Sequence, residues 1–100
     1  MIRTEFRALR VDEQELLPFD FSGQLVAGET ITSADVEIAV YSGEDANPAA
    51  VLASAASISG GVISQLVAAP LAGILYTLTC FATTSLGRLP AIQGVLAVLP

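Results

Sequence analysis

Charge is confined to one half of this chain. Thirteen of its fourteen charged side chains lie between Arg3 and Asp45, and from Ala46 to Pro100 only Arg88 is charged. About a quarter of an ordinary soluble sequence is Asp, Glu, Lys or Arg. A half-chain this neutral predicts that much of its surface faces other protein rather than water. The composition is therefore typical of one part of an assembly.

The same composition excludes several classes of function. The length of 100 residues suits one domain with a single core. A net charge of −6 disfavours nucleic-acid binding, which requires clustered Lys and Arg. The chain has no His, and its four basic residues are all Arg, so no catalytic triad or Schiff-base lysine is available. We therefore predict a protein that is not an enzyme and uses no cofactor, metal or small-molecule substrate.

Two features that suggest other chemistry have simpler interpretations. A single cysteine, Cys80, excludes an internal disulfide and is expected to be a small buried strand residue. The loop residues Glu44, Asp45 and Asn47 offer oxygens to a Ca²⁺ ion, but a solvated turn is the preferred interpretation. The longest stretch without a polar side chain, Leu66–Tyr76, is shorter than the roughly 18–20 residues of a membrane-spanning helix. We expect no membrane segment and no signal peptide.

The first 17 residues form a compositional block of their own, rich in both signs of charge. Ile2, Phe6 and Leu9 match a helical face. Residues 2–9 also suit an extended strand, because Ile2, Thr4, Phe6 and Ala8 alternate with Arg3, Glu5, Arg7 and Leu9. The pattern leaves both possibilities open. We predict an N-terminal arm over residues 1–17 and a separate domain over residues 18–100, with the arm either docking on a neighbour or forming a simple edge strand.

From residue 18 onward the signals are those of short strands. Residues 35–41 alternate clearly, with Val36, Ile38 and Val40 on one face. Residues 42–48 are dense in turn formers, and Gly60–Gly61 is a hairpin signal between strands expected at about 51–59 and 62–68.

The last part of the chain continues the same alternation. Residues 74–84 form a long strand with Tyr76, Leu78, Cys80 and Ala82 on one face, and residues 88–99 form the closing strand. Strands and turns at this spacing predict an all-β fold, a single antiparallel immunoglobulin-like β-sandwich of about seven strands with an N-terminal extended arm. The spacing of Gly73 and Tyr76 loosely matches a tyrosine corner, in which the phenol oxygen holds an incoming loop.

Two segments carry a resemblance to a known family. Residues 19–40 read FDFSGQLVAGETITSADVEIAV and residues 73–88 read GILYTLTCFATTSLGR. The pattern resembles that of small tailed-phage and prophage proteins known as fiber-tail adaptors. The matching positions are Asp20, Phe21, Ser22, Leu25, Gly28, Glu29, Thr30, Ile31, Gly73, Tyr76, Leu78, Thr79, Gly87 and Arg88. The chain departs at Phe21, where the family usually has Trp, and in its longer, more charged arm.

The resemblance implies a non-enzymatic structural protein of the phage tail that joins the tail tube or nozzle to the tail fibers. Its partners would be those phage proteins and further copies of itself in a homo-oligomer or symmetric ring. It would be made in the bacterial host cytoplasm and end in the virion. As candidate interface residues we take Ile2, Phe6 and Leu9 from the arm, Tyr41 beside the turn-rich loop, and the isolated charge Arg88.

Three alternatives remain open at the level of sequence. A capsid decoration, or cement, protein would have the same kind of small β-sandwich and arm. A carbohydrate-binding module would need exposed aromatic side chains for stacking, and Tyr41 is the one plausible platform. An enzyme is the least favoured, because the residues for a site are missing.

Overall fold

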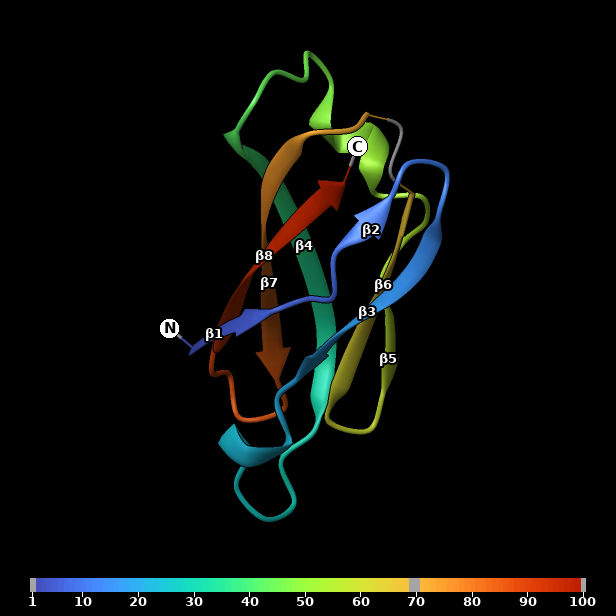
Figure 1. The fold of residues 1–100 in the computed structure, drawn as a ribbon. Coiled ribbons are helices and arrows are strands. Elements are labelled where there is room, and N and C mark those ends of the chain that lie inside the picture. Colours follow the sequence, from blue (N-terminus) through green and yellow to red (C-terminus); the bar gives the residue numbers. More distant parts are fainter. Residues whose placement is uncertain (1, 69–70, 100) are drawn as a thin grey trace.

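The fold is a two-sheet sandwich, seen in a computed structural model that describes residues 2–68 and 71–99. The described residues form eight strands and two short 3₁₀-helices and contain no α-helix. The elements are β1 (Ile2–Glu5), β2 (Leu9–Arg10), β3 (Gln14–Asp20), η1 (Ser22–Gln24), β4 (Ile31–Ser42), η2 (Pro48–Val51), β5 (Ser57–Ser59), β6 (Val62–Ala68), β7 (Ile74–Thr84) and β8 (Ala91–Leu99). The expectation of an all-β sandwich is confirmed (Figure 1).

The strand order identifies the type of sandwich. One sheet, called sheet A, has the order β1-β8-β7-β4, with β2 also paired to β8; the other, sheet B, has the order β3-β6-β5. In immunoglobulin constant-type domains the sheets are ABED and CFG. Counted from β3 as strand B, the present sheets are BED and CFG. The difference lies in the N-terminal strands, which join the CFG sheet instead of strand B.

The segment expected as an arm lies within this sandwich. Strands β1 and β2 both pair in parallel with β8, in the registers Ile2↔Ile92 and Leu9↔Val98. Sheet A is therefore mixed, and the sandwich is not purely antiparallel. The expected boundary between residues 17 and 18 falls inside β3, which begins at Gln14. Docking of this segment on a neighbouring protein stays a prediction.

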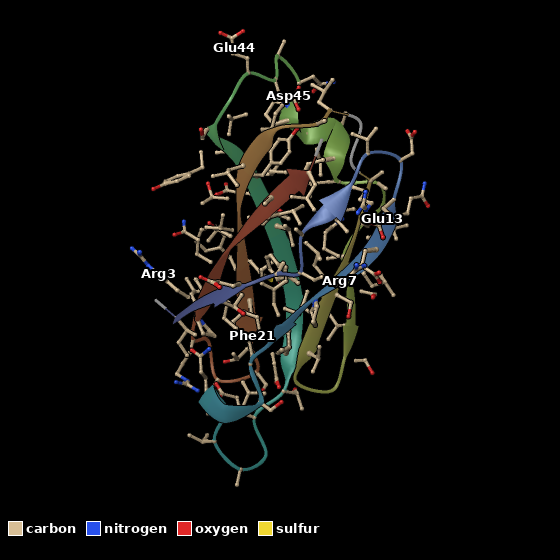
Figure 2. All side chains as sticks on the ribbon, viewed as in Figure 1. Arg3, Arg7, Glu13, Phe21, Glu44 and Asp45 are labelled. Carbon is tan, nitrogen blue, oxygen red and sulfur yellow. The ribbon has the colours of Figure 1, made fainter. Side chains whose placement is uncertain are left out.

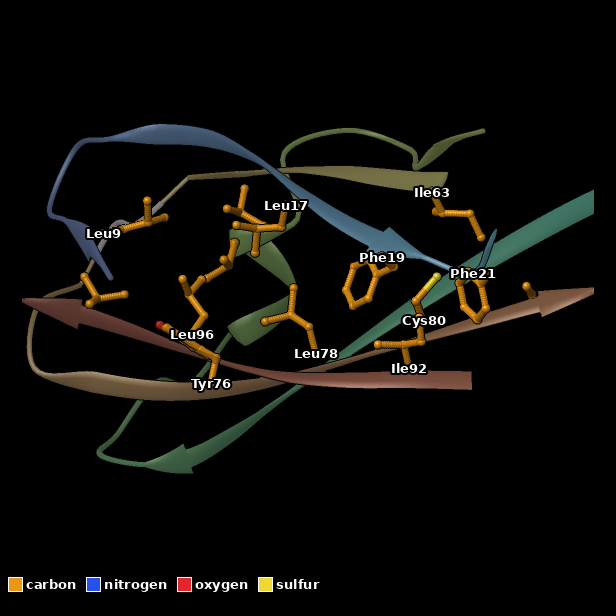
Figure 3. Packing of buried hydrophobic residues seen from close by; sticks show 14 of the residues in the cluster. Leu9, Leu17, Phe19, Phe21, Ile63, Tyr76, Leu78, Cys80, Ile92 and Leu96 are labelled. Atoms are coloured by element: carbon orange, nitrogen blue, oxygen red, sulfur yellow. The ribbon is translucent and has the colours of Figure 1, made fainter. Parts of the chain in front are cut away.

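The core lies between the two sheets and is built by the alternation of each strand (Figure 3). Tyr76, Leu78, Cys80 and Ala82 of β7 are all fully buried, as the sequence pattern predicts. Phe19 of β3 faces them from sheet B and is also fully buried. A free cysteine in this position behaves as a small apolar residue, which confirms the interpretation of Cys80.

Two expected strands differ from those observed. The predicted strand at 51–59 is reduced to β5, because residues 48–51 form η2, which begins with Pro48. A proline at the first helical position has a φ suited to a helix and needs no hydrogen-bond donor. The closing strand begins at Ala91, after the turn that contains Gly87. The hairpin turn at Gly60–Gly61 and the strand Ile74–Thr84 are confirmed.

Candidate interaction surface

Sheet A has five strands and sheet B has three, so among the described residues sheet A presents the broader outer face. The inward residues of β7 and β8 fill the core, so their alternate residues point outward. The uncharged centre of this outer face is formed by four residues that are each only partly buried: Thr77, Thr79, Gln93 and Val95. This part of the surface comes from the neutral half of the chain, as the charge distribution predicts.

Charges lie only at the two edges of this central part of the face. Arg3 and Glu5 stand on β1 at one edge, where Arg3 extends away from the sandwich (Figure 2). Glu37 stands on β4 at the other edge. The pairing registers place four side chains in one row across the sheet, in the order Arg3, Gln93, Thr79 and Glu37. Within the row, Gln93 Nε2 donates a hydrogen bond to Thr79 Oγ1 at 3.2 Å.

A shallow hollow of ≈ 460 Å³ lies on this face. It is lined by Arg3, Thr4, Glu5, Tyr41, Thr77, Gln93 and Val95. The Tyr41 side chain is 70% exposed, which is the second largest exposure among the large apolar and aromatic residues described. The lining offers hydrogen bonds, one charge of each sign and an aromatic ring. Such a surface suits non-covalent contact with another molecule.

The five predicted interface residues differ in whether their side chains are exposed or buried. Ile2, 48% exposed, and Tyr41 are accessible and belong to sheet A. Leu9 is fully buried in the core, and Phe6 packs against that core. The Phe6 ring meets Phe19 edge to face, with centroids 5.3 Å apart and an interplanar angle of 79°. Phe6 and Leu9 thus hold their own segment to the sandwich, a role that the sequence pattern alone did not reveal.

Arg88, the fifth predicted residue, forms an ion pair inside the chain. Its Nε donates to Glu29 Oε2 at 2.9 Å, its Nη2 donates to Glu29 Oε1, and Nη2 also reaches the Gln24 carbonyl at 2.6 Å. The Glu29 side chain is fully buried and also accepts a hydrogen bond from Thr84 Oγ1 at 2.5 Å. These contacts join the loop before β4 to the turn after β7.

The electrostatics of this ion pair follow from its hydrogen bonds. The Arg88 guanidinium, then the Thr84 hydroxyl and the Val26 N–H, lower the pKa of Glu29 to about 2, against the opposing effect of burial. Glu29 was missed as a structural residue by sequence reasoning. One signal pointed to it: the only residues within the chain that can form an ion pair with an arginine of the neutral half lie in the acidic half.

The opposite end of the sandwich has a second polar contact. Tyr76 Oη donates to Asp45 Oδ2 at 2.6 Å, and the Asn47 N–H donates to Asp45 Oδ1 at 2.9 Å. Burial, and then the neighbouring Asp45 carboxylate, raise the pKa of Tyr76 above its usual range. Tyr76 thus holds a loop, as a tyrosine corner does, but its acceptor is a side chain and not the backbone.

Other chemistry can be assessed in the part of the chain that the structure describes. Within residues 2–68 and 71–99 no three His, Cys, Asp or Glu side chains gather where a metal ion would bind. Both oxygens of Asp45, one of the three loop ligands considered for Ca²⁺, accept hydrogen bonds from the protein. Burial and the charge of Asp35 raise the pKa of the Cys80 thiol to about 12, so the nucleophilic thiolate is disfavoured.

None of the helices in residues 2–68 and 71–99 has the length and apolar character needed to cross a bilayer.

Comparison with known proteins places these features in a family. No curated protein matches the chain. A family model described as podophage GP4 fiber-tail adaptor protein gp77 matches residues 10–93. The matched range runs from β2 into β8, so it includes all of sheet B, most of sheet A and the Glu29–Arg88 ion pair. The resemblance seen in residues 19–40 and 73–88 is confirmed, and the chain belongs to the Gp77 family of podophage fiber-tail adaptors.

Proposed function

We propose that this chain is a structural component of the phage virion that joins the tail tube or nozzle to the tail fibers. The observation that carries the proposal is the family match over residues 10–93, which covers most of the sandwich. The work proposed is non-covalent: the chain binds two other proteins and holds them in place, without catalysis.

The surface chemistry supports two separate contacts. The outer face of sheet A is broad, uncharged at its centre and bordered by Tyr41, features of surfaces that bind protein. The N-terminal segment differs because it is charged: Arg7 Nη2 lies 3.4 Å from Glu13 Oε2 and 3.0 Å from Glu15 Oε2. We propose that these two surfaces contact different tail proteins, and that several copies form a ring.

The first test is to locate the chain on purified virions with a gold-labelled antibody. To keep the proposed surfaces free, the epitope is inserted beside Glu44, in the exposed loop between β4 and η2 (Figure 2). Label where the fibers attach supports the proposal. Label over the capsid identifies a decoration protein instead, and particles without label remove the virion role.

The second test concerns the joining step itself. Phage lacking this gene are expected to form tailed particles without fibers, and a wild-type copy supplied in the host should restore the fibers. Complementation with Tyr41→Ala tests the outer face of sheet A, with Glu44→Ala as an exposed control. Particles that lack the chain and keep all their fibers would refute the proposed role.

A further inference from the structure

The outer edge of β4 is a long strand edge that the described part of the chain leaves unpaired. β4 has 12 residues and pairs only with β7. Its pairing is regular between Ser33 and Val40, with irregularities only toward its two ends. Proteins usually protect such an edge with charged side chains, above all Lys, with Pro, with a bulge or with a covering loop. The regular part of β4, SADVEIAV, contains no Lys, Pro or bulge, and its two charges, Asp35 and Glu37, are both acidic.

The inward side chains of β4 are also incompletely covered. Ala34, Val36, Ile38 and Val40 all point toward the core, yet each is only partly buried. Sheet B has three strands and ends at β5 with three residues, so β4 is covered mainly by β5 and η2. A further strand beside β4 would shield this apolar row and satisfy its free backbone groups together.

The opposite edge of sheet A offers a matching strand. β1 pairs with β8 on one side, and no described residue pairs with its other side. Arg3 and Glu5 lie on its outer face, beside Gln93 and Val95. The alternate residue Ile2 faces inward, and yet 48% of it is exposed. β1 therefore resembles β4: on both strands the apolar side chains face inward and the charged side chains face outward.

We propose that β1 of one copy pairs in parallel with β4 of the next copy, with Arg3 beside Glu37, so that sheet A continues from copy to copy. The directions agree: β1 is parallel to β8, and β8 and β4 are both antiparallel to β7. A neighbouring copy in the same orientation therefore presents β1 parallel to β4. The inference deepens the ring assembly in the proposed function and rests on it.

The charges select one register for this pairing. With Arg3 beside Glu37, Glu5 lies beside the neutral Ala39, and the exposed Ile2 lies beside Val36. A shift of two residues that places Arg3 beside Asp35 brings Glu5 against Glu37, and like charges opposite each other destabilise a pair of strands.

The selected register also matches the sheet within each copy. Because Arg3, Gln93, Thr79 and Glu37 already form one row in a single copy, that row simply continues into the next. An interface between two different edges is heterologous, so it generates a ring when the rotation between copies closes.

Charge reversal is the first experiment. The association of the full chain is measured by analytical ultracentrifugation over a range of concentrations at low salt. Arg3→Glu and Glu37→Arg should each weaken association by about tenfold, and the double variant should recover it. Glu44→Arg makes the same change in charge at an exposed loop and should have no effect. A monomeric wild type, or association that neither reversal changes, would overturn the inference.

Cross-linking gives an independent second experiment that does not depend on the strength of association. Residues opposite each other on paired strands have a separation of Cα atoms that a disulfide can span. An Arg3→Cys protein mixed with a Glu37→Cys protein should form a disulfide-linked dimer under mild oxidation, and the wild type, with only the buried Cys80, should not. Dimer formed equally by each single variant alone, or no dimer in the mixture, contradicts the proposed pairing.

Failure of the inference and failure of the proposed function have different signatures. If the wild type is monomeric but antibody labels the fiber attachment site, the strand pairing is wrong and the tail role stands. If charge reversal acts as expected but no label reaches the tail, the pairing stands and the tail role is wrong.

Discussion

Arg88 reaches across the end of the sandwich to the buried carboxylate of Glu29, to which it donates from both Nε and Nη2. These residues are separated by 59 positions in the sequence. The only charge of the neutral half of the chain thus forms an internal contact that joins two loops.

This ion pair predicts an acid-dependent loss of stability. The pKa of Glu29 is about 2 in the folded chain, whereas the ordinary pKa of a glutamate side chain is 4.5. Between these values the unfolded chain binds the extra proton, so the free energy of unfolding falls as pH falls from about 4.5 to about 2. Thermal unfolding of Arg88→Met should show a lower Tm at pH 7 and a shallower decline across this window. Arg7→Met, which removes two exposed ion pairs, should change the slope much less than Arg88→Met does. Equal slopes in all three proteins would contradict the prediction.

Gly94 predicts a steric coupling with Phe6. A Cβ at position 94 would lie 2.6 Å from Cζ of Phe6, which is too close for carbon atoms. Gly94→Ala should therefore lower the free energy of unfolding by about 1–3 kcal/mol in chemical denaturation. In a Phe6→Ala background the same change should cost much less, because the ring is gone. Gly23→Ala is the control, since nothing lies within 4 Å of its added Cβ; additive effects of the two changes would refute the coupling.

Burial predicts unequal costs for two apolar truncations on paired strands. Leu78 of β7 is fully buried, whereas its partner Ile38 of β4 is only partly buried. Leu78→Ala should cost about 2–5 kcal/mol, and Ile38→Ala should cost less than about 2 kcal/mol. Urea denaturation of both variants measures the difference. An equal or larger cost for Ile38 in the monomer would show that β4 is better covered than its exposure indicates.

The hydrogen bond from Tyr76 to Asp45 has its own contribution. Tyr76→Phe removes the hydroxyl and should lower the free energy of unfolding by about 1.5–3 kcal/mol, the range for hydrogen bonds to charged groups. Amide hydrogen exchange in the loop after β4 should also become faster. Tyr41→Phe, at an exposed position, should change stability by less than about 0.5 kcal/mol. Unchanged stability in Tyr76→Phe would mean that water replaces the phenol without cost.

Asp12 shows how backbone geometry changes an expectation from charge. As an exposed arm residue, Asp12 would tolerate alanine with little effect. Its φ is 73°, in the left-handed region, where Asp is tolerated better than other residues with a Cβ. Asp12→Ala should therefore destabilise the fold by about 1 kcal/mol, while Asp12→Gly should be neutral or stabilising. Thermal unfolding of the two variants decides, and equal Tm values would exclude a backbone effect.

The sequence predicted those features that depend on neighbouring residues. Alternation placed Tyr76, Leu78, Cys80 and Ala82 on one buried face of β7, because successive side chains of a strand point to opposite sides. The hairpin at Gly60–Gly61 was equally predictable, since φ is +59° at Gly60 and glycine adopts such values without strain. The motifs in residues 19–40 and 73–88 also identified the family that the comparison confirmed.

The tertiary structure decided what depends on contacts distant in sequence. Nothing near Ile2 indicates a parallel pairing with Ile92, because the partner strand lies at the other end of the chain. The sequence pattern suggested that Phe6 is an exposed contact, but in the structure its ring packs against Gly94 and Phe19. Of the candidate surface, the sequence proposed Tyr41 and Ile2, which are exposed, but the row from Arg3 to Glu37 exists only through the register of four strands. Local patterns determine which side chains share a face of one strand, whereas pairing between strands determines which of those faces meet.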